Sequence, residues 1–368
     1  MIYFDNAATS YPKPPVVIKK VNEAMRCAGN PGRGLHGPAV WASQEVYKTR
    51  TKLSTLFNID DPMRIAFLHN ATAALNNAVN LCKAKILTTS MEHNSVLRPL
   101  YKRGYYDIIK AEPNGDVLPE KVISKISDTT GAVIMTHASN VTGNIYDIGT
   151  VGRFCRKKGI IFIVDASQTA GIVPIDVESM CIDVLCFTGH KSLFGVQGTG
   201  GIYVSPELND RISPLICGGT GTDSLLLKHP TEMPEAFEAG TVNVHGISAL
   251  GAGVDYITSF KEGEIFSHEQ VLKKKIIDEL SANNRVTIYG GAPEKSVGIV
   301  SFNLKGYESQ EIADILAEKE ICVRGGFHCA PLAHRTIGTY NTGTVRISLG
   351  ISNTYDEVIK VCKVINNL

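Results

Sequence analysis

One lysine of the sequence has neighbours that could make its amine reactive. Lys191 ends the segment Phe187-Thr188-Gly189-His190-Lys191, directly after an apolar run, and a glycine-rich stretch follows from Gly195 to Gly201. At the mouth of a parallel sheet a lysine can be kept partly away from water, which lowers its pKa and frees its amine to form a Schiff base. Thr188 and His190 can donate hydrogen bonds to a phosphate. Taken alone, however, a lysine after a strand is usually a solvated surface charge.

An aspartate ends another apolar run 26 residues earlier, in Ile163-Val164-Asp165-Ala166-Ser167-Gln168. A carboxylate at that position is costly unless it meets a cation, and open α/β sheets bind ligands at the carboxyl ends of their strands. An aspartate under a pyridoxal ring keeps the ring nitrogen protonated, so that the ring can accept electrons. Asp165 alone is more simply explained as a helix cap. Together with Lys191 it favours the cofactor.

Three further positions fit the same cofactor. Asn70-Ala71-Thr72 is expected between a strand and a helix from Ala73, where free amides and the helix dipole favour a phosphate. His93 follows another strand and could stack on a ring or move protons. Asn140 offers an amide to a carboxylate or phenolate oxygen. Each also has an ordinary interpretation, as a cap, a structural histidine or a turn asparagine.

One of the cysteines lies in a polar, glycine-rich segment, from Val323 to Pro331. Most free cysteines are buried and inert. Glycines before Cys329 permit a tight turn, Pro331 stiffens the chain after it, and the adjacent His328 favours an exposed thiol that can be activated. Cys329 is therefore a candidate nucleophile.

The elements that must position these residues alternate in type. The stretch from Arg64 to Val204 combines short apolar runs with helical patterns, which predicts βα units and a mostly parallel sheet. The expected strands are Ile65–Leu68, Lys85–Thr88, Tyr106–Ile109, Ala132–Thr136, Ile160–Val164, Val184–Phe187 and Gly201–Val204. The expected helices are Pro15–Cys27, Ala39–Phe57, Ala73–Lys83, Ser95–Lys102, Ile148–Lys157 and His245–Phe260.

From Glu269 onward the pattern changes to α+β, which indicates a second, smaller domain. The expected order there is a helix, strands Val286–Tyr289 and Ile299–Leu304, helix Ser309–Lys319, strands Ile321–Arg324 and Thr344–Ile347, and helix Asn353–Ile365. We thus expect an α/β protein with a large domain over residues 12–260. Residues 1–11 and 261–368 would form the smaller domain, which carries Cys329.

The composition of the chain argues against some classes of binding partner. With 43% hydrophobic residues, 20% charged residues and a formal charge of +1, the chain gives no electrostatic reason to bind nucleic acid or an anionic membrane. No apolar run approaches a transmembrane span, and the N-terminus does not resemble a signal peptide, so a cytoplasmic location is expected. The nine cysteines have scattered spacings without a CxxC pair, which argues against a disulfide framework. No metal site is expected.

These residues carry a family resemblance. The chain resembles the class V, fold-type I pyridoxal-phosphate enzymes of the cysteine desulfurase and selenocysteine lyase family. The similarity runs nearly end to end, through Tyr3-Phe4-Asp5-Asn6-Ala7-Ala8, Gly29-Asn30-Pro31-Gly32-Arg33-Gly34-Leu35-His36 and Arg346-Ile347-Ser348-Leu349. It implies a fold-type I transferase that binds pyridoxal 5'-phosphate and acts on a small amino acid.

The resemblance also implies roles by position. Lys191 would be the Schiff-base lysine and later the base, Asp165 would pair with the ring nitrogen, and His93 would stack on the ring. Gln168 would bond the phenolate oxygen. The phosphate would be held by Ala71, Thr72, Thr188 and His190, and by Thr241 from a neighbouring subunit, which implies a homodimer. Arg346, helped by Asn140, would bind the substrate carboxylate.

The implied reaction is attack of the Cys329 thiolate on the sulfur of L-cysteine, which leaves a persulfide and alanine and implies a sulfur-acceptor protein. Two departures bear on the substrate: Ala73 stands where the family often has glutamate, and Phe327 where a polar residue is common. Segment 217–238 is also unfamiliar. A selenocysteine lyase or related C–S or C–Se lyase shares every cofactor residue and stays an alternative. A class V aminotransferase is less favoured because it needs no thiol. A catalytically inactive scaffold that only binds a sulfur-acceptor partner is also less favoured, because it needs no cofactor site. The sequence does not reveal whether cysteine or selenocysteine is the preferred substrate. It also leaves open the stereochemical preference, the identity of the sulfur acceptor and the physiological pathway.

Overall fold

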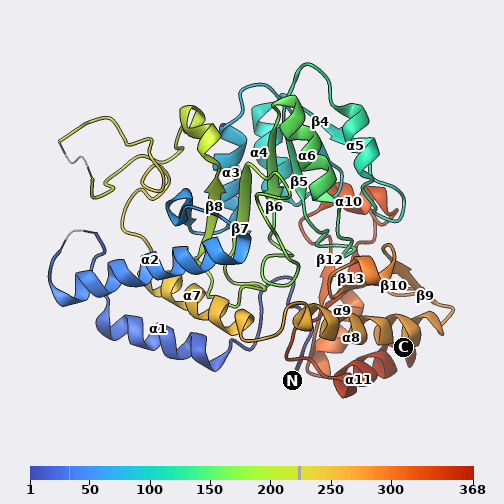
Figure 1. Ribbon diagram of the computed structural model, residues 1–368. Helices are drawn as coiled ribbons and strands as arrows, with labels where there is room; N and C mark the ends of the chain where they lie inside the picture. Colours follow the sequence, from blue (N-terminus) through green and yellow to red (C-terminus); the bar gives the residue numbers. More distant parts are fainter. Residues whose placement is uncertain (33, 223–224) are drawn as a thin grey trace.

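The computed structural model describes residues 1–32, 34–222 and 225–368 (Figure 1). The glycine-rich motif from Gly29 to His36 is therefore described apart from residue 33, and segment 217–238 apart from residues 223 and 224. In the part of the chain that is described, no helix is both long and apolar enough to cross a membrane.

A seven-stranded sheet forms the centre of the molecule (Figure 1). Its order is β2-β8-β7-β6-β5-β3-β4. From β7 to β4 neighbouring strands are parallel, whereas β8 runs antiparallel to both β7 and β2, so the mostly parallel sheet is confirmed. The strands are β2 (Ile65–Leu68), β3 (Lys85–Thr89), β4 (Tyr106–Ile109), β5 (Thr130–Thr136), β6 (Ile161–Asp165), β7 (Val184–Thr188) and β8 (Gly200–Val204).

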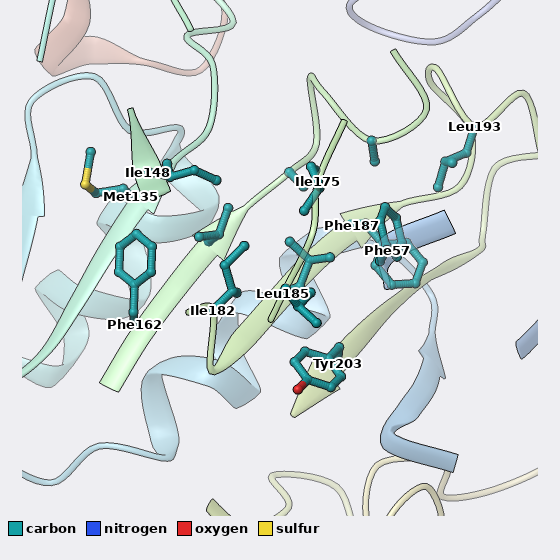
Figure 2. Close-up of a cluster of buried hydrophobic side chains, with 14 of the residues drawn as sticks. Phe57, Met135, Ile148, Phe162, Ile175, Ile182, Leu185, Phe187, Leu193 and Tyr203 are labelled. Carbon is teal, nitrogen blue, oxygen red and sulfur yellow. The ribbon is translucent and has the colours of Figure 1, made fainter. Parts of the chain in front are cut away.

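Helices cover both faces of this sheet, which explains why its central strands are apolar throughout. The helices are α1 (Pro15–Cys27), α2 (Gly37–Phe57), α3 (Ala71–Asn80), α4 (Asn94–Arg103), α5 (Pro119–Lys125), α6 (Ile148–Lys158) and α7 (Val244–Thr258). In β6, Phe162 and Val164 enter the core shared with α2, α6 and α7, whereas Ile161 and Ile163 enter the core shared with α3 and α4. Figure 2 shows the first core, where the rings of Phe57 and Phe187 lie 5.5 Å apart.

A second, four-stranded sheet lies in the C-terminal part of the chain, in the order β12-β13-β10-β9. Its strands are antiparallel, and α8, α9 and α11 pack beside it (Figure 1). The elements are α8 (Glu264–Ser281), β9 (Val286–Tyr289), β10 (Ile299–Leu304), α9 (Ser309–Glu318), β11 (Ile321–Cys322), β12 (Arg324–Gly326), α10 (Pro331–Thr336), β13 (Thr344–Ser348) and α11 (Tyr355–Asn366). The proposed domain boundary near residue 260 stays a prediction.

The N-terminal segment joins the two parts. Strand β1 (Ile2–Tyr3) pairs in parallel with β11, and Asp5 bridges to Ser348. Residues 7–13 then run along the large sheet, where four groups donate to the carbonyl of His190: the amide (3.1 Å) and the hydroxyl (3.2 Å) of Ser10, Oγ1 of Thr9 (3.0 Å) and Nζ of Lys13 (2.8 Å). The first residues of the chain therefore form a wall beside the predicted site.

Several sequence expectations need correction. The helix expected from Ala73 begins at Ala71, because Asn70 caps it by accepting from the Ala73 amide (2.9 Å). The strand expected over Ile321–Arg324 is two strands, since β11 pairs with β1 while β12 pairs with β13. The short helices α5 and α10, each starting at a proline, were not expected. These corrections move boundaries and leave the arrangement intact.

Candidate active site

A cavity of about 150 Å³ opens where strands of the large sheet end. Its walls come from the loops after β2, β3, β5, β6 and β7, because the carboxyl ends of parallel strands reach one edge. Nine of the residues singled out from sequence line it: Ala71, Thr72, His93, Asn140, Asp165, Gln168, Thr188, His190 and Lys191. Asn70, Ser95, Thr136 and Ser167 complete the lining. Cys329, Arg346 and Thr241 lie outside it.

Lys191 lines this cavity, and its surroundings change the acidity of its amine. Removal from bulk water lowers the pKa of the amine to about 8, while the nearby Asp165 charge acts to raise it. At neutral pH a larger share of the amine is therefore unprotonated than for an exposed lysine. The position suits an amine that must react with a carbonyl group.

Asp165 is the last residue of β6 and is buried, with 3% of its surface exposed. Its Oδ1 accepts hydrogen bonds from the amide (2.9 Å) and the hydroxyl (2.5 Å) of Ser167. These bonds fix the carboxylate at the floor of the cavity. Asp-x-Ser after a strand is an Asx-turn pattern, and that signal could have identified Ser167 from sequence.

His93 caps α4 and lines the cavity. Its Nδ1 lies 3.0 Å from the amide of Ser95, which can only donate, so Nδ1 accepts and the ring proton belongs on Nε2. Burial, and then the charge of Lys191, lower the pKa of His93 to about 4. The imidazole is thus neutral and held in one orientation. Ser95, which the sequence patterns did not single out, also bonds Thr72 (Oγ to Oγ1, 2.7 Å).

Some hydrogen-bonding groups of the residues that line the cavity have no partner within the described part of the chain. Among the described residues, Oγ1 of Thr188 and Nδ1 of His190 are buried without a hydrogen bond. Buried polar atoms of this kind are rare and point to a ligand. The first turn of α3, at Ala71 and Thr72, adds backbone amides and the positive end of a helix dipole. This donor set fits a phosphate, and with Lys191 and Asp165 it fits pyridoxal phosphate.

Arg346 lies next to the cavity, on β13. It is 2% exposed, and its Nη1 donates to the backbone carbonyl of Asn140 (3.0 Å) while its Nη2 pairs with Asp5 (2.9 Å). Asn140 lines the cavity, so it connects the guanidinium to the site. The charge of Arg346 also contributes to lowering the pKa of Lys191. Asp5 was not expected from sequence as part of the site.

Cys329 is exposed, on the loop between β12 and α10. His328 and Cys329 both have positive φ angles, 46° and 58°, which side chains other than glycine rarely adopt. Two hydrogen bonds hold this loop against the cavity wall: the Asn140 side-chain amide donates to the carbonyl of His328 (2.6 Å), and the Asn94 backbone amide donates to that of Cys329 (2.7 Å). The thiol is thus accessible while its backbone is fixed.

Thr241 lies elsewhere within the chain. It lines a separate cavity of about 430 Å³ together with residues of the loops around Pro31 and Thr220. The segment before it is anchored by a buried ion pair between Glu238 and Arg50 (2.6 Å). Thr241 of one chain therefore does not line the cavity that holds the candidate phosphate-binding residues of the same chain. Its role across a subunit boundary stays a prediction.

Gln168 lines the cavity, but its amide also donates to the carbonyl of Ala7 (3.3 Å). The side chain is thus held by the N-terminal segment at the edge of the site. Its expected bond to a phenolate oxygen is untested by this geometry and stays a prediction.

Comparison with known proteins places the chain among relatives of one kind. The family model described as Aminotransferase class-V matches residues 2–361. Proteins named probable cysteine desulfurase share 31% identity in Methanothermobacter thermautotrophicus and 34% in Pyrococcus abyssi; each match covers 97% of this chain and 92% of the relative. The solved apo structure of a cysteine desulfurase from Thermococcus onnurineus NA1 matches with a TM-score of 0.94 and 32% identity, over 100% of this chain and 94% of that one.

Proposed function

The chain belongs to the class-V aminotransferase family, and we propose that within it the protein is a cysteine desulfurase, which takes sulfur from cysteine and holds it as a persulfide on Cys329. Relatives that bear this name match nearly the whole chain. The observation that carries the proposal is Cys329 itself. It is an exposed thiol on a strained loop that Asn140 and Asn94 tie to the cavity. An aminotransferase has no use for such a thiol.

The cavity residues are suited to hold pyridoxal phosphate. Lys191 would bind it covalently, Asp165 would pair with its ring nitrogen and His93 would lie against its ring. Thr72, Thr188 and His190, with the amides at the start of α3, would hold its phosphate, and Gln168 would reach its phenolate oxygen. When bound, the cofactor withdraws electrons from the α-carbon of an attached amino acid.

The side chains then divide the work. Arg346 binds the substrate carboxylate, and Asn140 supports it. Lys191, whose pKa burial lowers to about 8, takes the α-proton as a base. The Cys329 thiolate attacks the substrate sulfur, so that a sulfur–sulfur bond forms as the bond from sulfur to Cβ breaks. The electron pair of the broken bond stays with Cβ, which takes up one proton. The proton held by Lys191 returns to the α-carbon, and the carbon chain leaves as alanine.

Substitution of the thiol tests this proposal. In Cys329→Ala, alanine production from L-cysteine should fall by about 10³-fold or more, because removal of a nucleophile leaves only binding and orientation. The absorbance of the cofactor on Lys191 should persist. Mass spectrometry of the wild-type protein after brief exposure to cysteine should find one added sulfur atom on the peptide that contains Cys329.

Cys217→Ala is the matched control, because Cys217 is the other exposed cysteine among the described residues. It should keep wild-type activity. If Cys329→Ala released sulfur from cysteine as fast as the wild type, the protein would be a β-eliminating lyase and the proposal would fail. Residual turnover of selenocysteine alone is compatible with the proposal, since selenide is the better leaving group.

A further inference from the structure

The guanidinium of Arg346 is only partly used by the protein. It carries five N–H groups. One on Nη1 bonds Asn140, and one on Nη2 bonds Asp5. Its Nε, however, is buried and has no hydrogen-bond partner among the described residues. A buried charged donor without a partner is costly, so the site retains a donor for something that is not part of the chain.

Asp5 is held firmly enough to orient its partner. Its backbone bridges to Ser348, two residues beyond Arg346 on β13. Its carbonyl accepts from the amide of Ala8 (3.0 Å) and the hydroxyl of Tyr3 (3.2 Å), which closes a turn around it. Asp5 and Arg346 thus sit on backbones that are bonded to each other, and the 2.9 Å ion pair sets the rotation of the guanidinium.

We propose that Asp5 is a positioning residue, whose carboxylate turns Arg346 so that the Nε side of the guanidinium is presented to the carboxylate of an α-amino acid substrate. This inference rests on the proposed function and extends it. A guanidinium recognises a carboxylate best through two parallel N–H bonds. With its Nη1 and Nη2 contacts fixed from two sides, the guanidinium cannot rotate freely, and the free Nε–H keeps a constant direction.

A competing role for Asp5 predicts the opposite effect. If Asp5 merely occupied Arg346 as a counter-ion that substrate must displace, its removal would tighten substrate binding. If Asp5 orients Arg346, its removal frees the guanidinium to turn and weakens substrate binding. The sign of the change in KM therefore separates the two roles.

The test uses Asp5→Asn in the holoenzyme, because asparagine keeps the size and an acceptor oxygen but loses the charge. We expect the KM for L-cysteine to rise about tenfold, the loss expected for a hydrogen bond between charged groups, with kcat within about twofold. The Kd of L-alanine, measured by isothermal titration calorimetry, should rise by a similar factor. Inhibition by cysteamine, which has the amine and thiol but no carboxylate, should not change.

Asp107→Asn is the matched control, since Asp107 forms an exposed ion pair with Lys85 (2.7 Å) at the far edge of the sheet. It should leave all these constants unchanged. If Asp5→Asn does not purify as a folded protein, Asp5→Glu keeps the charge and moves it by one methylene, and its KM should also rise.

Each outcome decides the inference. An unchanged or lower KM, or an equal loss of cysteamine binding that indicates general damage, overturns it. If the wild type makes no alanine from cysteine, the proposed function fails, and the calorimetry with L-alanine still decides the role of Asp5.

Discussion

Lys191 and Asp165 show how burial, rather than residue type, creates reactivity. Both lie at one sheet edge, where water is largely excluded, so the charge of Lys191 depends on the nearby carboxylate. Burial lowers the pKa of Lys191 to about 8, and the carboxylate of Asp165 opposes that shift. The amine is therefore mostly protonated below about pH 8 and mostly neutral above it.

This balance predicts the pH dependence of cofactor loading. Only the neutral amine attacks an aldehyde, so the rate at which apoprotein binds pyridoxal phosphate should rise with pH, with a midpoint of about 8. Because Asp165 raises the pKa of Lys191, Asp165→Asn should move the midpoint to lower pH. Stopped-flow absorbance measures both. A midpoint near that of an exposed lysine, at about pH 10.4, would contradict the burial argument, and Asp107→Asn serves as the unshifted control.

At this scale the sequence identified residues that follow strands. Lys191, Asp165 and His93 could be assigned because each comes directly after an apolar run, and parallel strands bring such positions to one edge. Asp5 and Lys13 could not be assigned in this way. They precede every strand of the large sheet, and only the pairing of β1 with β11 and the bonds to His190 bring them beside the cavity.

Helix α3 links stability to ligand binding through its cap. Asn70 accepts a hydrogen bond from the Ala73 amide (2.9 Å), and the residues of that first turn line the cavity. A cap of this type contributes about 1 kcal/mol. Loss of the Asn70 cap should loosen the backbone amides of the first turn of α3, which are suited to bind a phosphate.

Asn70→Ala should therefore lower the free energy of unfolding by about 1 kcal/mol and weaken binding of pyridoxal phosphate by about fivefold. Asp147→Ala is the matched control, because Asp147 caps α6 in the same manner (2.9 Å to the Thr150 amide) without lining the cavity. It should lose similar stability in urea unfolding and keep its cofactor affinity. Equal affinities for the two variants would remove the link between the α3 cap and the site.

Most elements were predictable because their apolar periodicity is strong, and the errors concern their ends. The helix expected from Asn353 begins at Tyr355, since Thr354 and Glu357 form a capping box that was readable in the sequence. The split between β11 and β12 was not readable. It depends on which distant strand each half pairs with, and β1 contributes only two residues. Pairing partners of short strands are set by the whole fold.

The molecule as a whole exposes apolar side chains on one set of loops. Leu35 is 100% exposed, Leu225 is 99% exposed and Leu227 is 106% exposed. The loops that carry them project on the same side in Figure 1, beyond α2. Residues near Pro31 and Thr220 share a cavity there with Thr241. Exposed apolar side chains on two loops of one side are typical of a surface that a partner covers, which agrees with the homodimer expected from the family resemblance.

Light scattering should accordingly give about twice the chain mass of 39.8 kDa. A double variant, Leu225→Asp with Leu227→Asp, should shift the protein toward monomer and weaken its cofactor binding, because Thr241 could no longer reach a neighbouring phosphate site. Tyr101→Asp, on an exposed residue of α4, is the control and should stay dimeric. A fully active wild-type monomer would rule out the shared site.

The ion pair between Asp5 and Arg346 joins positions 341 residues apart, and this separation has a consequence for biosynthesis. At about 5–20 residues per second, a ribosome needs roughly 15–70 s to translate the stretch between them. For most of that time β1 lacks its partner β11, and until Arg346 is made the carboxylate of Asp5 has no ion-pair partner. Translation must reach β13 before the ion pair that we propose to position Arg346 for substrate binding can form. A prematurely terminated polypeptide could therefore carry Lys191 but lack Arg346.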